Sequence, residues 1–483
     1  MDALLHLVQA INAYLSNYVL VALLVGAGLL FTVRTRFAQV RFFAEGMRRV
    51  FGGFSLSGEK HAGGMSSFQA LATAVAAQVG TGNIVGACGA ILVGGPGAIF
   101  WMWVIAFLGM ATNYAEAVLA QRTRVVKPDG SVHGGPAYYI QAAFPGRFGR
   151  ALATFFAAAI ILALGFMGSM VQSNSIAATC ATAFGVPAWA MGLAVAVIAG
   201  FVFLGGVRRI ASLTEKLVPL MALFYLAGSA AVLVAHASNL PVAFALIFQC
   251  AFDPHAQVGG VTFGIVAAVT QGAKRGLFSN EAGMGSTPHA HALANVRNPH
   301  EQGVTGIAAV FIDTFVVVTM TALVVISVLY VGDGAMAQGP SAGIDKTNMA
   351  QVAFSSLMGE SLGGAFVAVC LLFFAFSTII GWNFFARLNV EWLLGRRAVP
   401  AFSIMALAFI FAGSLLANDL VWELADMFNM LMVLPNVMAL AALSGTVAGC
   451  ARTRGERCEL PVQDDGDAGA ERAEGRMGDD RAF

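Results

Sequence analysis

The chain has 483 residues, of which 58% are hydrophobic and only 11% are charged, and its formal net charge at pH 7 is +1. Soluble domains carry roughly 25% charged residues, so this composition predicts an all-α polytopic membrane protein. The balanced charge provides no basic surface of the kind that binds nucleic acid.

Apolar windows long enough to cross a bilayer recur along the chain and predict eleven transmembrane helices. The N-terminus, M-D-A-L-L-H-L, lacks the basic region of a secretory signal peptide, so we expect the first helix to be retained. The windows are centred near Ala22, Gly80, Ala106, Phe166, Ala196, Ala227, Ile265, Val317, Leu371, Ala408 and Met432.

Lysine and arginine collect in alternate connections between these windows, as they do on the cytoplasmic side of membrane proteins. Lys346 alone falls on the other side, in a connection with Asp333, Asp345 and Glu360. The alternation predicts an integral plasma (inner) membrane protein whose N-terminus lies outside and whose C-terminus is cytoplasmic.

Three connections have helical character. Residues 37–53 place apolar side chains among arginines and predict an amphipathic helix at the inner membrane surface. Residues 239–252 and 347–358 predict short helices on the outer side. From about Arg454 the composition is typical of a disordered tail.

The six cysteines form no CxxC pair and are interpreted as packing residues, so neither a disulfide framework nor a zinc site is expected.

The second window contains an unusual run, A-A-Q-V-G-T-G-N-I-V-G, at residues 76–86. A spanning helix must satisfy its backbone polar groups internally, so glycines at this depth are tolerated where the backbone lines a cavity. We interpret the run as a helix broken to hold a ligand. Close packing of small residues between helices is the alternative.

A second run, G-L-F-S-N-E-A-G-M-G-S at residues 276–286, lies five windows later and crosses the membrane in the opposite direction. Two broken helices in corresponding, inverted positions are typical of a transporter site, although a glycine cap at a helix end would look similar. The predicted domains are an N-terminal helix with a cytoplasmic segment (1–66), two inverted repeats of five helices (67–238 and 239–450) and the tail (451–483).

Several longer motifs resemble one family. They are G-T-G-N-I-V-G, G-G-P-G-A-I-F-W-M-W (94–103), G-M-A-T-N-Y-A-E-A (109–117), G-G-P-A-Y-Y-I (134–140), T-E-K-L-V-P (214–219), N-E-A-G-M-G-S (280–286) and F-I-D-T (311–314). In this order they resemble the alanine or glycine:cation symporter family. The resemblance implies the leucine-transporter fold preceded by one extra helix. It also implies symport of a small neutral amino acid with Na⁺, or occasionally H⁺, and no obligatory protein partner.

The resemblance also implies a substrate site at the first break. The amide N–H groups of Thr81 and Gly82 would bind the substrate carboxylate, because an exposed helix N-terminus offers unpaired donors. Gln172 would contact the substrate, and Trp382 would close the side-chain end of the pocket. Interhelical bonding of Gln172 and an interfacial position of Trp382 are the alternatives. The full predicted substrate set is Gln78, Thr81, Gly82, Gln172, Phe278, Asn280 and Trp382.

Two sodium sites follow from the same resemblance. The Asn83 amide oxygen and carbonyls near Gln78 would bind one ion, since a hard cation favours oxygen ligands. The second set comprises the carbonyls of Ala76 and Val79 and the hydroxyls of Ser377 and Thr378. Each of these hydroxyls has an alternative role in a bond to its own helix.

Ionisable residues near the membrane windows have two interpretations. Glu116, Glu281 and Asp313 are candidate proton carriers, or they pair with Arg122 or Lys274 for structure. His289 and His291 are interpreted as surface residues rather than metal ligands.

Rival functions are also considered. The alternatives to Na⁺-coupled uptake of alanine or glycine are an intramembrane enzyme built around Ser286 and His289, a passive channel, and an H⁺-coupled or glutamine symporter. The favoured prediction is a secondary transporter that works by alternating access and is not an enzyme.

Overall fold

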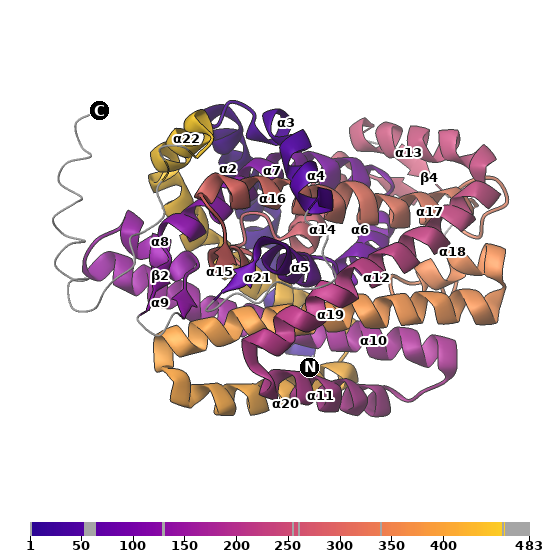
Figure 1. Ribbon diagram of the computed structural model, residues 1–483. Coiled ribbons are helices and arrows are strands. Elements are labelled where there is room, and N and C mark those ends of the chain that lie inside the picture. Colours follow the sequence, from indigo (N-terminus) through magenta and orange to yellow (C-terminus); the bar gives the residue numbers. More distant parts are fainter. Residues whose placement is uncertain are drawn as a thin grey trace.

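The computed structural model describes residues 2–52, 64–127, 131–253, 256–258, 261–338, 341–455 and 458. Within these ranges the chain is predominantly helical (Figure 1). Seven helices are long and apolar enough to cross a membrane, and a bent pair would make an eighth. Leu20–Arg34 and Ala188–Leu204, which match the first and fifth predicted windows, are apolar but shorter. The count of eleven spans therefore stays a prediction.

The elements of the first half of the chain run from the N-terminal arm to the end of α12. They are α1 (Asp2–Tyr14), η1 (Leu15–Val19), α2 (Leu20–Arg34), α3 (Ala38–Arg41), α4 (Phe43–Gly52), β1 (Met65–Ser66), α5 (Ser67–Gln78), η2 (Gly82–Gly86), α6 (Ala87–Gly94), α7 (Gly97–Arg122), β2 (Val125–Val126), β3 (Val132–His133), α8 (Pro136–Ala143), α9 (Arg147–Ile160), η3 (Ile161–Gly168), α10 (Ser169–Phe184), α11 (Ala188–Leu204) and α12 (Gly206–Ala235).

The second half follows the same pattern of long helices and short connecting elements. It comprises η4 (Ala237–Asn239), α13 (Leu240–Phe252), β4 (Ala256–Val258), β5 (Val261–Phe263), α14 (Ile265–Asn280), α15 (Pro288–Leu293), β6 (Ala294–Asn295), α16 (Pro299–Val310), η5 (Phe311–Val318), α17 (Thr319–Leu329), α18 (Met349–Met358), α19 (Glu360–Leu394), η6 (Arg396–Ala398), α20 (Val399–Leu415), α21 (Asn418–Ala442) and α22 (Ser444–Thr453). The strands form three two-stranded pairs: β1 with β6 in parallel, and β2 with β3 and β4 with β5 antiparallel.

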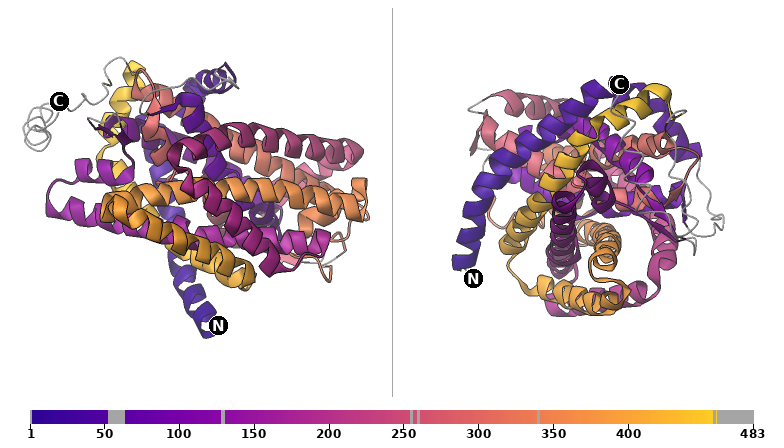
Figure 2. Two further views of the ribbon diagram at one scale, coloured as in Figure 1. Left: turned by 60° about the horizontal axis from the view of Figure 1, so that its bottom comes forward. Right: turned by 90° about the vertical axis from the view of Figure 1, so that its left-hand side faces the viewer.

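The helices form a large central bundle with a smaller apolar layer on one side. α10, α11, α19 and α20 pack together along the lower side of Figure 1, where a second apolar cluster joins them. The end-on view in Figure 2 shows α1 and α2 as one extended arm at the edge of the molecule. The broken helices α5–α6 and α14–α15 lie inside the bundle, and α14 packs against η1 and α2 of this arm.

The two breaks are the main irregularities inside the bundle. Ser67–Gln78 and Gly82–Gly94 meet at a bend of 48°. After α14, Glu281 has a left-handed backbone with φ of +56°, and Gly283 and Gly285 also have positive φ. A left-handed residue ends a helix because its carbonyl leaves the helical hydrogen-bond pattern.

The predicted centre of the seventh window is wrong by about half a span. Ile265 begins α14 instead of lying mid-membrane, and the second break follows sixteen residues later. The hydropathy window lies too early because the second half of α14 carries Lys274, Arg275 and other polar residues, and Arg275 pairs with Asp426 inside the protein. The break is therefore internal, with α15 continuing beyond it.

The three predicted connecting helices are present, one of them in two pieces. α13 and α18 match residues 239–252 and 347–358. Within the predicted segment 37–53, the described residues form α3 and α4, separated at Phe42. α4 packs against the start of α16, where Glu45 approaches His300 at 3.6 Å and Arg49 approaches Glu301 at 3.5 Å. The predicted disordered tail beyond residue 458 lies outside the described residues.

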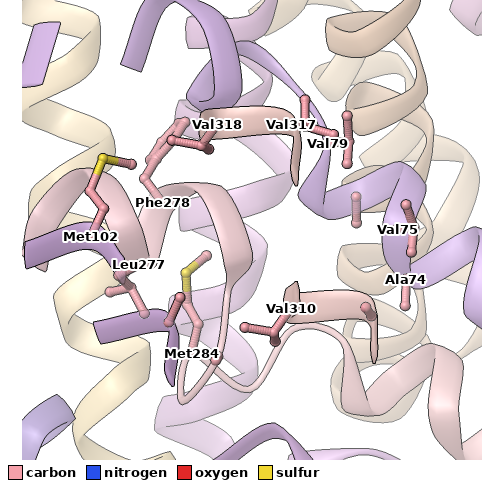
Figure 3. Packing of buried hydrophobic residues seen from close by; sticks show 14 of the residues in the cluster. Ala74, Val75, Val79, Met102, Leu277, Phe278, Met284, Val310, Val317 and Val318 are labelled. Atoms are coloured by element: carbon pink, nitrogen blue, oxygen red, sulfur yellow. The ribbon is translucent and has the colours of Figure 1, made fainter. Parts of the chain in front are cut away.

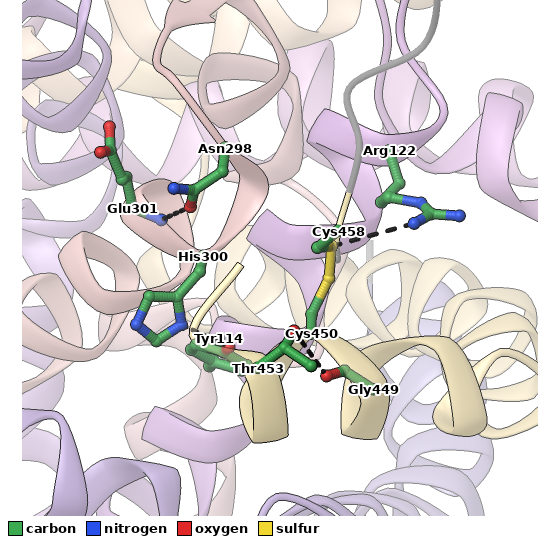
Figure 4. The surroundings of a disulfide bond; sticks show 9 residues. All are labelled: Tyr114, Arg122, Asn298, His300, Glu301, Gly449, Cys450, Thr453 and Cys458. Atoms are coloured by element: carbon green, nitrogen blue, oxygen red, sulfur yellow. Dashed lines mark hydrogen bonds between the residues drawn. A yellow bond between two sulfur atoms is a disulfide. The ribbon is translucent and has the colours of Figure 1, made fainter. Parts of the chain in front are cut away.

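The cysteine interpretation is wrong for two of the six residues. Cys450 and Cys458 form a disulfide, with their Cα atoms 5.2 Å apart (Figure 4). The chain reverses after α22 through the left-handed residues Arg454 and Gly455, which brings Cys458 back to the helix. This turn is not visible as a cysteine spacing motif. Cys88, Cys180, Cys250 and Cys370 are free and buried, as packing residues are.

Candidate substrate and ion site

The first break is held open by a side chain from its own sequence. α5 begins with a capping box between Ser66 and Gln69 and ends at Gln78, and the backbone of the next residue, Val79, is extended. The Asn83 Oδ1 atom accepts a hydrogen bond from the Gly80 N–H at 2.8 Å. Thr81 and Asn83 are fully buried. The polar backbone of the break is therefore exposed to the protein interior, where only a buried ligand or side chain can satisfy it.

Asn83 also connects the first break to a buried carboxylate on η5. Its Nδ2 atom donates to Asp313 Oδ1 at 2.6 Å, and Ser279 Oγ and Thr314 Oγ1 each donate to Asp313 Oδ2 at 2.8 Å. All four side chains are fully buried. No lysine or arginine pairs with Asp313 in the described part of the chain. A buried carboxylate surrounded by oxygen-bearing side chains fits a hard monovalent cation.

Thr378 on α19 reaches across to the end of α5. Its hydroxyl oxygen lies within hydrogen-bond distance of the carbonyls of Ala76 at 3.0 Å and Val79 at 3.3 Å, and of Phe374 on its own helix, and its one proton is shared among them. Ser377 bonds Phe374 instead, at 2.8 Å. The structure therefore brings together three of the four residues predicted for a second ion and turns the fourth hydroxyl toward its own helix.

Polar atoms without partners collect around the first break. Gln172 Oε1 accepts from the Thr81 N–H at 3.0 Å, and Gln78 Nε2 donates to the Asn280 carbonyl at 2.7 Å. Among the described residues, Gln78 Oε1, Thr81 Oγ1 and Gln172 Nε2 are buried without a hydrogen-bond partner. Such groups are costly to bury, so donors and acceptors gathered here favour a polar ligand.

Aromatic side chains close one end of this region. Trp382 and Phe278 meet edge to face at 5.6 Å, and Trp382 Nε1 donates to Glu281 Oε1. The Trp382 ring fits against Gly168, where an added Cβ would come within 2.4 Å of it. Figure 3 shows apolar side chains around both breaks packed in one cluster. Trp382 is 1% exposed and lies inside the bundle, so it is not an interfacial tryptophan.

Glu116 fixes the second break. Its carboxylate accepts from the backbone N–H groups of Gly283 at 3.0 Å and Gly285 at 2.9 Å, and from Asn436 Nδ2 at 2.7 Å. These contacts replace the helical hydrogen bonds that the glycines give up. Glu116 is therefore a structural clamp on the loop between α14 and α15.

The expected pairing of the acids with Arg122 or Lys274 is wrong. The Glu116 carboxylate accepts hydrogen bonds from backbone amides. Glu281 accepts them from the Trp382 indole N–H and the Ser286 hydroxyl, and Asp313 accepts them from polar side chains. Burial explains the difference, because these carboxylates lie in the bundle interior whereas a long basic side chain extends toward water.

The surface assignment of the two histidines is also wrong. His289 and His291 are 2% and 0% exposed. His289 bonds the Ser286 carbonyl and Asn389, and His291 bonds Gln302. α15 is enclosed by α5, α7 and α19, which bury both rings. Within the described residues no group of three His, Cys, Asp or Glu side chains could hold a metal ion.

The predicted residues from the two breaks and from α10 and α19 thus meet in one region. Sequence reasoning missed Ser279 and the bonding of Asp313 to Asn83. The signal was the F-I-D-T motif, in which an acid stands inside an apolar span.

Comparisons with known proteins agree with a transporter. A model described as the sodium:alanine symporter family matches residues 1–456. The "sodium/alanine symporter AgcS" of Methanococcus maripaludis is 38% identical over 442 residues, covering 91% of this chain and 95% of the relative. The "probable sodium/glutamine symporter GlnT" of Bacillus subtilis is 38% identical over 444 residues, covering 92% and 89%.

Solved structures give the fold. The transporter MhsT, in complex with L-phenylalanine, aligns with a TM-score of 0.56 at 13% identity, covering 82% of this chain and all of that one. A manganese transporter of Eremococcus coleocola aligns with a TM-score of 0.52 at 14% identity, covering 80% and 77%. Identity this low supports a shared architecture and says nothing of substrate.

Proposed function

Because the chain belongs to the sodium:alanine symporter family, we propose that it carries a small neutral amino acid, alanine or glycine, into the cell together with Na⁺. The observation that carries the proposal is the meeting of both broken helices at Asp313, through Asn83 of the first and Ser279 of the second. A site shared by two broken helices can couple ion and substrate, because each ligand stabilises the same arrangement of the breaks.

The substrate carboxylate is assigned to the N–H groups of Thr81 and Gly82 at the start of η2. The Gln172 carbonyl oxygen accepts from the Thr81 N–H. An incoming carboxylate would displace it, and the Gln172 amide would then turn its Nε2 donor toward the ligand. Gln78 Oε1 and the Asn280 segment would receive the ammonium. The paired rings of Trp382 and Phe278 would limit the substrate to a short side chain.

One Na⁺ is assigned to the Asp313 carboxylate and the hydroxyl oxygens of Ser279 and Thr314, where the ion would neutralise the buried carboxylate. Asn83 would become a ligand by turning its Oδ1 atom from the Gly80 N–H toward the ion, because its Nδ2 group faces Asp313 in the structure. A second Na⁺ is assigned to Ala76, Val79 and Thr378, with Ser377 as a further ligand after a rotamer change. The similarity to the sodium/alanine symporter AgcS supports sodium coupling, and the geometry supports oxygen-rich sites at both positions.

Alternating access would supply the coupling. With the arginine-rich connections in the cytoplasm and Lys346 outside, an inward-moving Na⁺ gains ~2.3 kcal/mol per 100 mV of membrane potential. With one Na⁺ per amino acid and a potential of about 100 mV, this energy is enough for roughly 50-fold accumulation of the amino acid inside the cell.

Uptake of labelled alanine into proteoliposomes tests the proposal. We expect saturable uptake driven by an imposed Na⁺ gradient and lost in choline. An uptake rate that is unaffected by both Na⁺ and pH gradients would exclude symport. A relative named as a putative sodium/proton-dependent alanine carrier, from Bacillus subtilis and 38% identical over 449 residues, makes H⁺ coupling the second candidate. Uptake driven by a pH gradient in choline would identify it, and competition by glutamine would test the other substrate class.

A further inference from the structure

Lys346 is the one basic residue that breaks the charge alternation of the sequence, and it lies at a cavity. This cavity of about 270 Å³ is formed by the first broken helix beyond its break, by α14 and by the start of α21. Its lining residues are Gln9, Val85, Gly86, Gly89, Val93, Gln271, Arg275, Lys346, Asp419, Trp422 and Glu423. In the predicted orientation this is the outer side of the protein.

The cavity carries two charges of each sign. Arg275 forms a two-point ion pair with Asp426, with N–O distances of 2.6 and 3.2 Å. Lys346 Nζ lies 2.7 Å from Asp419 Oδ1, but the Asp419 side chain is 73% exposed. An ion pair this exposed contributes little to stability, so a ligand carboxylate can replace Asp419 beside the lysine.

Trp422 forms the floor of the cavity. The Arg275 guanidinium lies 4.6 Å and the Lys346 ammonium 5.7 Å from its ring centroid. Trp422 is 3% exposed, and among the described residues its indole Nε1 has no hydrogen-bond partner. The two cations lie over the ring face, and the unpartnered N–H lies in the ring plane, so Trp422 adds a donor at its edge to a cavity lining that already attracts negative charge.

The N-terminal arm holds one of the two acids of the cavity, Glu423 of α21, in place. Asn12 on α1 donates to Glu423, to its backbone carbonyl at 2.8 Å and to Oε2 at 2.5 Å. This fixes an acid at the cavity wall, across from the cations. α1 lies outside the two predicted inverted repeats, so the arm completes a feature that the ten core helices alone would lack.

The cavity adjoins the central site. Trp422 packs on Phe278 with ring centroids 4.8 Å apart, and Phe278 in turn faces Gly82. Val85 and Gly86 line the cavity from η2, the same short turn that begins with Gly82. One layer of aromatic rings therefore separates the two regions.

We propose that this cavity is an outer binding site that captures the zwitterionic amino acid before the Phe278–Trp422 layer opens. Arg275, Lys346 and the Trp422 N–H receive the carboxylate, and Glu423 and Asp419 receive the ammonium. The inference rests on the proposed amino-acid transport and adds a second substrate-binding site to it. A compound that lacks the carboxylate loses three of these five contacts, and one that lacks the ammonium loses two.

Saturation-transfer NMR with alanine as the probe tests the site directly. It is measured on the full-length protein carrying the substitution Gly82→Leu. A leucine at position 82 is expected to close the central site, because even its Cβ would lie 3.1 Å from Phe278 and Ser279. We expect the alanine methyl signal to be saturated in this variant and to lose that saturation when Lys346→Gln is added. Lys127→Gln, the same change at an exposed lysine elsewhere, should leave it unchanged.

Absence of saturation in a Gly82→Leu protein with normal thermal unfolding, or saturation that Lys346→Gln does not alter, would overturn the proposal. Oriented proteoliposomes provide a second measurement that does not depend on Gly82→Leu. Lys346→Gln should raise the KM for external alanine about tenfold, as loss of one charge-assisted hydrogen bond predicts, and leave the KM for efflux unchanged. Equal shifts on both sides would contradict an outer site. If the unaltered protein shows no ion-driven alanine uptake, the proposed function itself fails.

Discussion

Asn83 and Asp313 meet at 2.6 Å, although 230 residues separate them in the sequence. Asn83 at the same time holds the Gly80 N–H at 2.8 Å. One amide side chain therefore joins the geometry of the first break to the charge state of a carboxylate on η5. Any cation that binds Asp313 acts on the break through this contact.

Asp313→Asn is expected to weaken ion activation. The substitution keeps the side-chain shape and removes the negative charge, so the Na⁺ concentration for half-maximal alanine uptake should rise at least about tenfold. Na⁺ titration of uptake measures the change, with Asp333→Asn at an exposed loop acid as the matched control. An unaltered Na⁺ dependence would remove Asp313 from the ion site.

The carboxylate assignment predicts unequal effects at neighbouring positions. Thr81→Ala should change alanine uptake only a few-fold, about 1 kcal/mol, because the proposed contact is the backbone N–H. Gly82→Leu should abolish uptake, since a side chain there collides with Phe278 and Ser279. Initial rates of alanine uptake, measured at matched expression of the two variants, test this difference. Equal, complete loss in both variants would point to the Thr81 hydroxyl instead.

Trp382→Phe is expected to broaden substrate choice and lower stability. The smaller ring leaves space beside Gly168, and loss of the indole N–H removes one partner of the buried Glu281, which costs roughly 1–3 kcal/mol. Competition of alanine uptake by valine and leucine measures the first effect, and thermal unfolding the second. Trp189→Phe, at a tryptophan that is 56% exposed, is the control. Unchanged competition would show that Trp382 does not limit substrate size.

Glu116→Gln tests the clamp on the second break. The amide group of glutamine replaces one acceptor oxygen with a donor that faces the N–H of Gly283 or Gly285, so we expect destabilisation of roughly 1–3 kcal/mol and a lower maximal uptake rate. Thermal unfolding and uptake at saturating alanine report the two effects. Glu360→Gln, at an exposed acid, should alter neither. A stable, fully active Glu116→Gln protein would show that the loop needs no clamp.

The sequence by itself determined the membrane class, the two breaks and their family. Composition and hydropathy report whether a segment avoids water, and glycine runs inside such segments report where the helix cannot continue. Both signals are local, so residues 76–86 and 276–286 stand out without any structure. The same locality explains the misplaced seventh window, because polar residues of α14 that face protein are counted as if they faced lipid.

Only the tertiary structure decided which buried polar groups meet. Asp313 lies between Asn83 and Ser279, Glu116 holds the glycines of the second break, and Lys346 reaches Asp419 and Trp422. A hydrogen bond forms over about 3 Å between specific atoms, and the hydrophobic pattern of a helix records its buried face without recording its partner across the bundle. The acids and the single outer lysine therefore gained definite partners only when the helices were packed.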